Sequence, residues 1–319
     1  MKTPGWFLKR NFVAYLLLPL SVAYYIGGKL VYNYRRFFQK SSKIPVICIG
    51  NIMSGGVGKT PIVREIAKFL PNSAVIMRGY KGKKAGKVEK NDNVADVGDE
   101  AKMLAESGLS VFVGPNRQKS IKMVEKAGFS YVIMDDGFQN PTIRKDVSIL
   151  VFDGGIGVGN GFLLPAGPLR EPVKSGMNRA DAILIINSKI KKAASHYKIC
   201  RSQYKIVPVY HASTKPVYTG IKGDVFAFAG IGYNRKFFDM VENMAGITVI
   251  GKKGFPDHYQ YSQSDLRRII GESKEAEILT TEKDWVRLPG EYKKKIKFIP
   301  QKTVLEKSFW QWLERKLEI

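Results

Sequence analysis

Short apolar runs alternate with amphipathic stretches from Ile44 onward, and this alternation predicts an α/β fold. The apolar runs are continuous, as in strands buried on both faces, and they occupy residues 45–50, 74–80, 111–114, 131–136, 148–153 and 182–187. Between them, stretches with helical spacing occupy 59–70, 99–107 and 116–127. Such strands, joined by crossover helices, predict a parallel sheet with helices on its faces.

A second, smaller α/β unit is predicted beyond the Gly- and Pro-rich connection 154–176 and the looser segment 188–223. Its expected strands are 225–231 and 276–284, the latter ending in polar residues, and its expected helices are 235–246 and 264–272. A helical stripe then predicts a C-terminal helix packed back on the body, through Leu305, Phe309, Leu313 and Leu317. We therefore divide the chain into an N-terminal helix, a core, a smaller α/β domain and a C-terminal helix, at 1–36, 37–215, 216–302 and 303–319.

The N-terminal segment is both apolar and basic. Eighteen uncharged residues lie between Arg10 and Lys29, enough for a helix of about 27 Å, slightly short of the hydrocarbon core of a bilayer. There are four alternatives for this segment: a cleaved signal peptide, a spanning helix, a helix on the membrane surface, and a helix packed on the protein's own core. The sequence after Gly28 offers no convincing cleavage site, and basic residues flank both ends. We expect a helix lying on an anionic membrane surface.

Charge and cysteine content limit the choice of partner and compartment. The 319 residues include 52 Lys and Arg against 28 Asp and Glu, a net charge of +24. This balance favours nucleic acid, an acidic membrane or a phosphorylated substrate. No acidic residue precedes Glu65, so the N-terminal region is a separate basic segment. Two cysteines cannot form a disulfide framework, which favours a reducing compartment.

The sharpest motif directly follows the apolar run 45–50 and opens the helical stretch 59–70. Its residues are Ser54, Gly55, Gly56, Val57, Gly58, Lys59 and Thr60. A strand that turns through glycines into a helix directs N–H groups at a phosphate chain, while Lys59 supplies a cation and Thr60 a hydroxyl for Mg²⁺. The strict pattern has Gly where this chain has Met53, but the strand–loop–helix context favours a P-loop that holds phosphates and Mg²⁺ over an ordinary glycine-rich turn.

Acidic residues are expected beside this loop. Asp135 and Asp136 end an apolar run at the carboxyl edge of the sheet, where two adjacent carboxylates favour Mg²⁺. Asp99 and Glu100 open a helical stretch, and they either cap that helix or face the site. His258 lies in a Pro-Asp turn of the second unit, and it either braces the turn or faces the cleft between the domains.

Other chemistries lack their motifs in this sequence. No register of 154–161 fits the dinucleotide-binding pattern, no Cys/His set has zinc spacing, and no G-x-S-x-G elbow is present. These absences count against a dinucleotide-dependent enzyme, a zinc site and a Ser-His-Asp hydrolase.

Nine blocks in a fixed order make the chain resemble the tetraacyldisaccharide 4′-kinase (lipid A 4′-kinase) family. They are PVICIGNIMSGGVGKTP (45–61), RGYKGK (78–83), VGDEA (97–101), NRQ (116–118), DDGFQ (135–139), LLPAGPLREP (163–172), FAGIG (228–232), FPDHY (255–259) and LTTEKDW (279–285). The family also lacks the leading glycine of the strict loop pattern. It usually has His after DDGFQ, where this chain has Asn140.

The resemblance implies a kinase that uses ATP with Mg²⁺ to phosphorylate the 4′-hydroxyl of the tetraacyldisaccharide 1-phosphate, giving lipid IVA in lipid A biosynthesis. It implies a P-loop core, a smaller domain that closes over the nucleotide, and a peripheral or monotopic helix on the cytoplasmic face of the bacterial inner membrane. Asp99 then accepts the hydroxyl proton with help from His258. The metal set is Thr60, Asp135, Asp136 and Glu100, and the remaining site lining is Arg117, Gln139, Arg170 and Glu171.

Three rival functions fit the sequence less well. A partitioning ATPase has a signature lysine where this chain has Ser54. A nucleic-acid-binding protein is not supported by any recognised motif, and the acid-free region coincides with the apolar segment. A soluble kinase for a small metabolite leaves residues 11–28 unexplained. We expect an acylated glycolipid and an anionic membrane as partners, with no nucleic acid and no obligate protein partner.

Overall fold

The larger of two sheets forms the core of the protein, for which a computed structural model describes residues 4–55, 57–80, 82–186, 207–217, 220–232 and 234–319. Its strands, in spatial order, are β13 (Gln301–Leu305), β8 (Val209–Pro216), β7 (Ala182–Ile186), β6 (Val147–Asp153), β1 (Val46–Gly50), β5 (Tyr131–Asp135), β2 (Ser73–Met77), β4 (Ser110–Val113) and β3 (Gly86–Lys87). All neighbours pair in parallel except at the two edges, where β13 and β3 are antiparallel. The predicted parallel α/β core is confirmed.

Helices cover this sheet, and they include those that the periodicity predicts at 59–70, 99–107 and 116–127. They are α3 (Lys59–Phe69), α4 (Val94–Val97), α5 (Asp99–Glu106), α6 (Arg117–Lys126), α7 (Val173–Arg179) and α13 (Lys307–Leu317). α3 begins at the loop after β1 and packs on the middle of the sheet. Because β1 lies between β6 and β5, its carboxyl end is next to the carboxyl end of β5. This order brings the lysine loop and the acidic strand end together.

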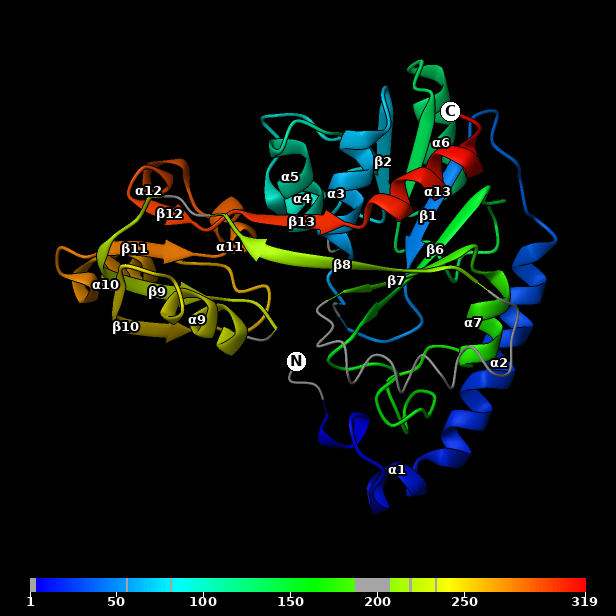
Figure 1. The fold of residues 1–319 in the computed structure, drawn as a ribbon, viewed down its shortest axis with the longest axis horizontal. Helices are drawn as coiled ribbons and strands as arrows, with labels where there is room; N and C mark the ends of the chain where they lie inside the picture. Colours follow the sequence, from blue (N-terminus) through cyan, green and yellow to red (C-terminus); the bar gives the residue numbers. More distant parts are fainter. Residues whose placement is uncertain (1–3, 56, 81, 187–206, 218–219, 233) are drawn as a thin grey trace.

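A smaller parallel sheet forms the second domain, beside the first in Figure 1. Its strands, in spatial order, are β10 (Ile247–Gly254), β9 (Gly223–Ala229), β11 (Glu277–Thr280) and β12 (Ile296–Phe298). Its helices are α9 (Asn234–Glu242), α10 (Gln263–Ser273), α11 (Glu282–Val286) and α12 (Gly290–Lys293). Two apolar clusters, one that contains Phe228 and one that contains Ala227, give this domain a core of its own.

Two sequence predictions about the C-terminal part of the chain, from residue 276 onward, are wrong in detail. The segment 276–284 is not one strand, because β11 ends at Thr280 and the hydroxyl of Thr281 caps α11 by accepting the Asp284 N–H. Leu305 belongs to strand β13 rather than to the C-terminal helix, so the expected boundary at 302/303 cuts a strand. Phe309 and Leu313 do bury the helix against the larger core.

The N-terminal segment forms η1 (Gly5–Phe7), α1 (Phe12–Leu16) and α2 (Leu18–Arg36). Pro19 falls in the first turn of α2, where a missing N–H does no harm. The segment contacts the connection 154–176, since the Ser21 hydroxyl donates to Leu163 O and accepts from Ala166 N, and the Trp6 indole donates to Pro165 O. No helix in the described part of the chain is long and apolar enough to cross a membrane.

Candidate active site

The lysine loop has the strand–loop–helix form that the sequence predicts. Gly58 adopts a left-handed conformation (φ 76°) as it leads into α3, which is why glycine suits this position. Lys59 begins the helix, and its Nζ lies 3.1 Å from Asp136 Oδ1 and 3.4 Å from Asn51 Oδ1. Thr60 follows and is buried. The loop thus leads into a helix N-terminus with a cation beside it, as phosphate binding requires.

The rest of the loop is only partly described. Ser54 is exposed and donates its N–H to Pro168 O, which ties the loop to the connection 154–176. Gly55 is also exposed, whereas Val57 is buried in the core. Gly56, which the sequence assigns to phosphate binding, lies outside the described residues.

Asp135 and Asp136 lie at the carboxyl end of β5, beside the loop. Asp135 is buried, and its Oδ1 finds no hydrogen-bond partner among the described residues. Burial, reinforced by the nearby charge of Glu100, raises the pKa of Asp135 to about 7. Burial also disfavours the charge of Asp136, but Lys59 and Arg170 outweigh it and hold the pKa of Asp136 below its usual range. Asp136 is therefore neutralised by cations, whereas the unpartnered Oδ1 of Asp135 can accept a cation.

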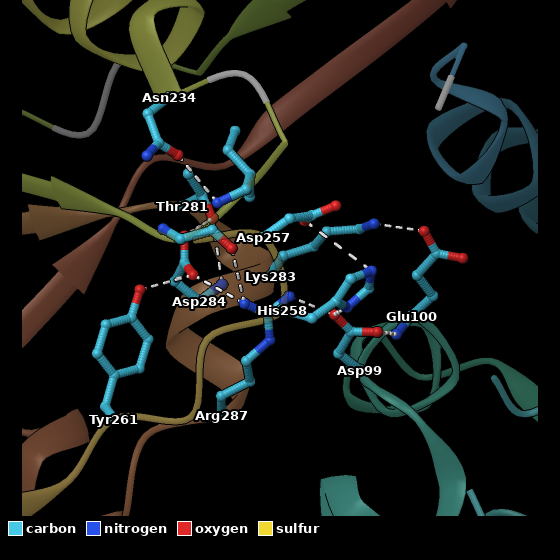
Figure 2. Close-up of polar contacts among 12 residues, drawn as sticks. Asp99, Glu100, Asn234, Asp257, His258, Tyr261, Thr281, Lys283, Asp284 and Arg287 are labelled. Carbon is cyan, nitrogen blue, oxygen red and sulfur yellow. Dashed lines mark hydrogen bonds and ion pairs between the residues drawn. The ribbon is translucent and has the colours of Figure 1, made fainter. Parts of the chain in front are cut away.

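The expected pair of Asp99 and His258 is brought together across the two domains. Asp99 is the first residue of α5 in the larger domain, and His258 follows β10 in the smaller one. His258 Nδ1 lies 2.9 Å from Asp99 Oδ2, and Asp99 is buried (Figure 2). Although burial disfavours the charged carboxylate, the hydrogen bond from His258 and the charges of Lys283 and Arg287 hold the pKa of Asp99 well below its usual range.

Gln139, Arg170 and Glu171 form a chain of contacts beside the loop. The Gln139 amide donates to Asn51 O (2.7 Å) and to Glu171 Oε1 (2.9 Å). Arg170 Nη1 donates to Asp136 Oδ2 (3.3 Å) and to Gln139 Oε1 (3.4 Å). These contacts hold Arg170, a cation, next to the acidic end of β5.

Two further predicted site residues, Arg117 and Glu100, and the departure from the family pattern at Asn140 also have defined contacts. Arg117, the first residue of α6, is buried and donates to Gly114 O and Asp135 O. Glu100 pairs with Lys283 from the smaller domain. Asn140, the departure from the family pattern, uses its Oδ1 to accept from the N–H and the hydroxyl of Thr142, so it stabilises a turn.

Comparison with known proteins decides the family. The family model described as "Tetraacyldisaccharide-1-P 4'-kinase" matches residues 13–318. The chain belongs to this kinase family. Two curated relatives named tetraacyldisaccharide 4′-kinase, from Gluconobacter oxydans and Phenylobacterium zucineum, are 36% and 37% identical to it. These matches cover 93% and 96% of this chain and 92% and 96% of the relatives.

A solved structure of the same family has a similar fold. It is described as "apo" form LpxK from Aquifex aeolicus in complex with ATP, and it matches with a TM-score of 0.78 and 27% sequence identity. The match covers 96% of this chain and 99% of that one. Membership of the tetraacyldisaccharide-1-P 4′-kinase family confirms the resemblance drawn from the sequence blocks, the P-loop kinase fold, and a phosphotransferase activity that uses ATP with Mg²⁺ on an alcohol acceptor.

The residues around the kinase loop suit the magnesium ion that ATP brings. Within the described ranges, no three His, Cys, Asp or Glu side chains form a metal site by themselves. A Mg²⁺ ion bound with ATP needs only one or two carboxylates, because phosphate oxygens and water supply its other ligands. The unpartnered Asp135 Oδ1 and the Thr60 hydroxyl offer hard oxygen ligands of this kind. These residues fit the ion.

Sequence reasoning missed the cations that surround Asp99 and Glu100. Lys283 belongs to α11 and contacts Glu100. Arg287 directly follows α11 and contacts Asp99. The block 279–285, which carried the family resemblance, contains Lys283 but suggested no role for it, and Arg287 lies outside that block. Arg64 on α3 pairs with Glu282, so a further contact joins the lysine-loop helix to α11.

Proposed function

We propose that the chain transfers the γ-phosphate of ATP to the 4′-hydroxyl of a tetraacyldisaccharide 1-phosphate, and that Asp99 and His258 form its acid–base pair. The observation that carries this proposal is the 2.9 Å contact between these side chains, which come from different domains. A carboxylate oriented by an imidazole can accept the proton of an attacking hydroxyl. Because the pair needs both domains, substrate binding and domain closure would assemble it together.

In the proposed reaction, the 4′-oxygen forms a bond to the γ-phosphorus while the bond from that phosphorus to the β,γ-bridging oxygen breaks. The hydroxyl proton passes to Asp99, and ADP leaves. Lys59 and Arg170 place positive charge where negative charge spreads over the transferring group. Mg²⁺, when bound, neutralises phosphate charge. The residues for metal contact are Thr60 and Asp135, with Asp136 beside them.

The direct test of this function is a phosphate-transfer assay. Radiolabelled ATP is incubated with the full chain and the tetraacyldisaccharide 1-phosphate in detergent micelles, and the label is located in the lipid product. We expect label at the 4′-position and much slower transfer to the same disaccharide after its acyl chains are removed, because delivery at an interface is lost. Equal rates on the two acceptors would instead support a soluble kinase for a small sugar.

We also propose that the N-terminal helices attach the enzyme peripherally to an anionic membrane, at the cytoplasmic face of the inner membrane. Three leucines on α1 and α2, Leu16, Leu20 and Leu30, expose between 57% and 65% of their surfaces. Ser21 faces the protein body, so α2 presents most of its apolar surface outward. Arg35 and Arg36 end the helix with positive charge. An exposed apolar helix with a basic end is suited to lipid headgroups.

Replacing Leu16, Leu20 and Leu30 together by serine should release the protein from vesicles that contain phosphatidylglycerol. Burial of a leucine contributes about 1.5–3 kcal/mol, so the triple variant should bind at least about tenfold more weakly. The melting temperature should change little, because these side chains are exposed. The matched control replaces Ile250 and Val304, exposed apolar residues far from the N-terminal helices in sequence, by serine. Equal sedimentation of the triple variant and the control would locate the attachment elsewhere.

A further inference from the structure

Arg287, which directly follows α11, joins the two domains at the proposed acid–base pair. Its side chain is 1% exposed, and its Nη2 donates to Asp99 Oδ2 across the domain boundary. Its Nη1 donates to Asp284 Oδ1 (3.0 Å) and to Gly230 O (3.1 Å) within the smaller domain. Figure 2 shows the guanidinium between the two carboxylates. One arginine therefore contacts the expected base and a fixed framework behind it.

Asp284 holds the guanidinium in place. Its side chain is fully buried, and it accepts hydrogen bonds from the hydroxyls of Tyr261 (2.8 Å) and Thr281 (2.6 Å) and from the Gly230 N–H (3.0 Å). A buried carboxylate with this many donors cannot turn away from Arg287 without leaving some of them unpaired, which is costly. Asp284 thus fixes the direction from which Arg287 reaches Asp99.

The same framework also holds His258. The Gly230 carbonyl accepts hydrogen bonds from the backbone N–H of His258 (3.1 Å) and from Arg287 Nη1. One backbone group therefore contacts both partners of Asp99. His258 itself has a left-handed backbone (φ 58°), which the turn after Pro256 maintains. The backbone approaches closely here, because a Cβ on Gly230 would lie 2.7 Å from the Tyr261 hydroxyl and 3.0 Å from Asp284 Oδ1.

We propose that Arg287, held by Asp284, is a positioning residue that aligns the Asp99 carboxylate with His258 when the domains meet. This inference rests on the proposed function of the Asp99–His258 pair. Asp99 is buried, and a buried carboxylate needs a paired cation. Lys283, the other nearby cation, is paired with Glu100. A planar guanidinium can donate in fixed directions to two carboxylates and a carbonyl, whereas an ammonium cannot keep that geometry.

A purely structural role would make Arg287 one of several charged contacts between the domains. Arg64, whose side chain is 10% exposed, also bridges the domains, and the carboxylate that it pairs with is Glu282 rather than Asp99. Arg64→Lys is therefore the matched control for Arg287→Lys. Both changes keep the positive charge, and both replace a guanidinium in a bridge between the domains.

The test measures kcat and KM for the full-length variants, with the tetraacyldisaccharide 1-phosphate in micelles. We expect Arg287→Lys to lower kcat by about 30-fold or more, with both KM values within about threefold of wild type, because ground-state binding is kept. Arg64→Lys should keep kcat within about threefold of wild type. Wild-type kcat in Arg287→Lys, a change confined to KM, or an equal kcat loss in Arg64→Lys would overturn the proposal.

Two further measurements separate positioning from folding. Methylguanidinium at millimolar concentration should partly restore kcat to Arg287→Ala, and methylammonium should not. Asp284→Asn removes the support while keeping Arg287, and it should lower kcat in the same manner and non-additively with Arg287→Lys. If Arg287→Ala does not fold, Asp284→Asn and Arg287→Lys decide the matter alone. Additive losses in their combination would contradict the proposal.

Asp99→Ala in the same assay distinguishes this inference from the proposed function. If Arg287 acts through Asp99, Arg287→Lys should cause little further loss in the Asp99→Ala background. Near-wild-type kcat in Asp99→Ala would refute the proposed acid–base role of the Asp99–His258 pair. A strong loss in Asp99→Ala together with wild-type kcat in Arg287→Lys would refute only the inference about Arg287.

Discussion

Lys59→Ala should lower kcat/KM for phosphoryl transfer by about 10² or more without unfolding the protein. The variant removes a cation at the N-terminus of α3, where transferring phosphate would gather negative charge. It also removes the 3.1 Å contact with Asp136, which keeps Arg170 as a partner. The measurement is steady-state kinetics with ATP and the acylated acceptor, together with a melting curve.

Lys68→Ala is the matched control for this change. Lys68 lies on the same helix but is exposed. Retention of more than about a tenth of wild-type kcat/KM in Lys59→Ala, a loss of only ~1.4 kcal/mol in barrier, would show that the loop does not hold the transferring phosphate.

Asp99→Ala and His258→Ala should each lower kcat by roughly 10²–10⁴, the range usual for general-base catalysis. Asp99→Ala removes the carboxylate that accepts the proton, and His258→Ala removes the imidazole that orients this carboxylate. ATP affinity, measured separately by equilibrium binding, should change by less than about threefold, because the polar contacts of the Asp99 and His258 side chains among the described residues are with each other, Glu100, Asp257 and Arg287 rather than with the lysine loop.

Glu106→Ala is the matched control at the other end of α5. Glu106 pairs with Lys293 of the smaller domain and so also bridges the domains. Its kcat should stay close to wild type. Near-wild-type kcat in Asp99→Ala would leave Asp99 as a structural residue of the first turn of α5, and the same result for His258→Ala would leave His258 as part of a turn.

The core of the fold could be predicted because its signals are local. Each buried parallel strand is a continuous apolar run, and Lys59 follows its strand through glycines into a helix. Strand β10 was not predicted, because its apolar residues do not alternate with its polar ones: Ile250 lies on the exposed face and Lys253 on the half-buried face. Strand β13 was missed because its pairing with β8 joins residues almost ninety positions apart, and local spacing does not report such pairing.

The candidate site shows the same limit. Asp99 and His258 were paired only through a resemblance to a family, because the two residues are 159 positions apart in the sequence. Arg287 reaches Asp99 across 188 residues, and nothing in its local sequence distinguishes a buried arginine from an exposed one. Asn140 was noticed only as a departure from the family pattern, and its turn-forming contacts required the structure.

A double-mutant cycle on Asp99 and His258 shows whether these two residues, which come from different domains, act as one unit in proton transfer. The measured quantity is kcat at saturating ATP for wild type, Asp99→Ala, His258→Ala and the double variant. We expect kcat of the double variant to be within about threefold of that of the more damaged single variant, because mutations of groups that serve one step have strongly non-additive effects. Fully multiplicative losses would contradict this expectation.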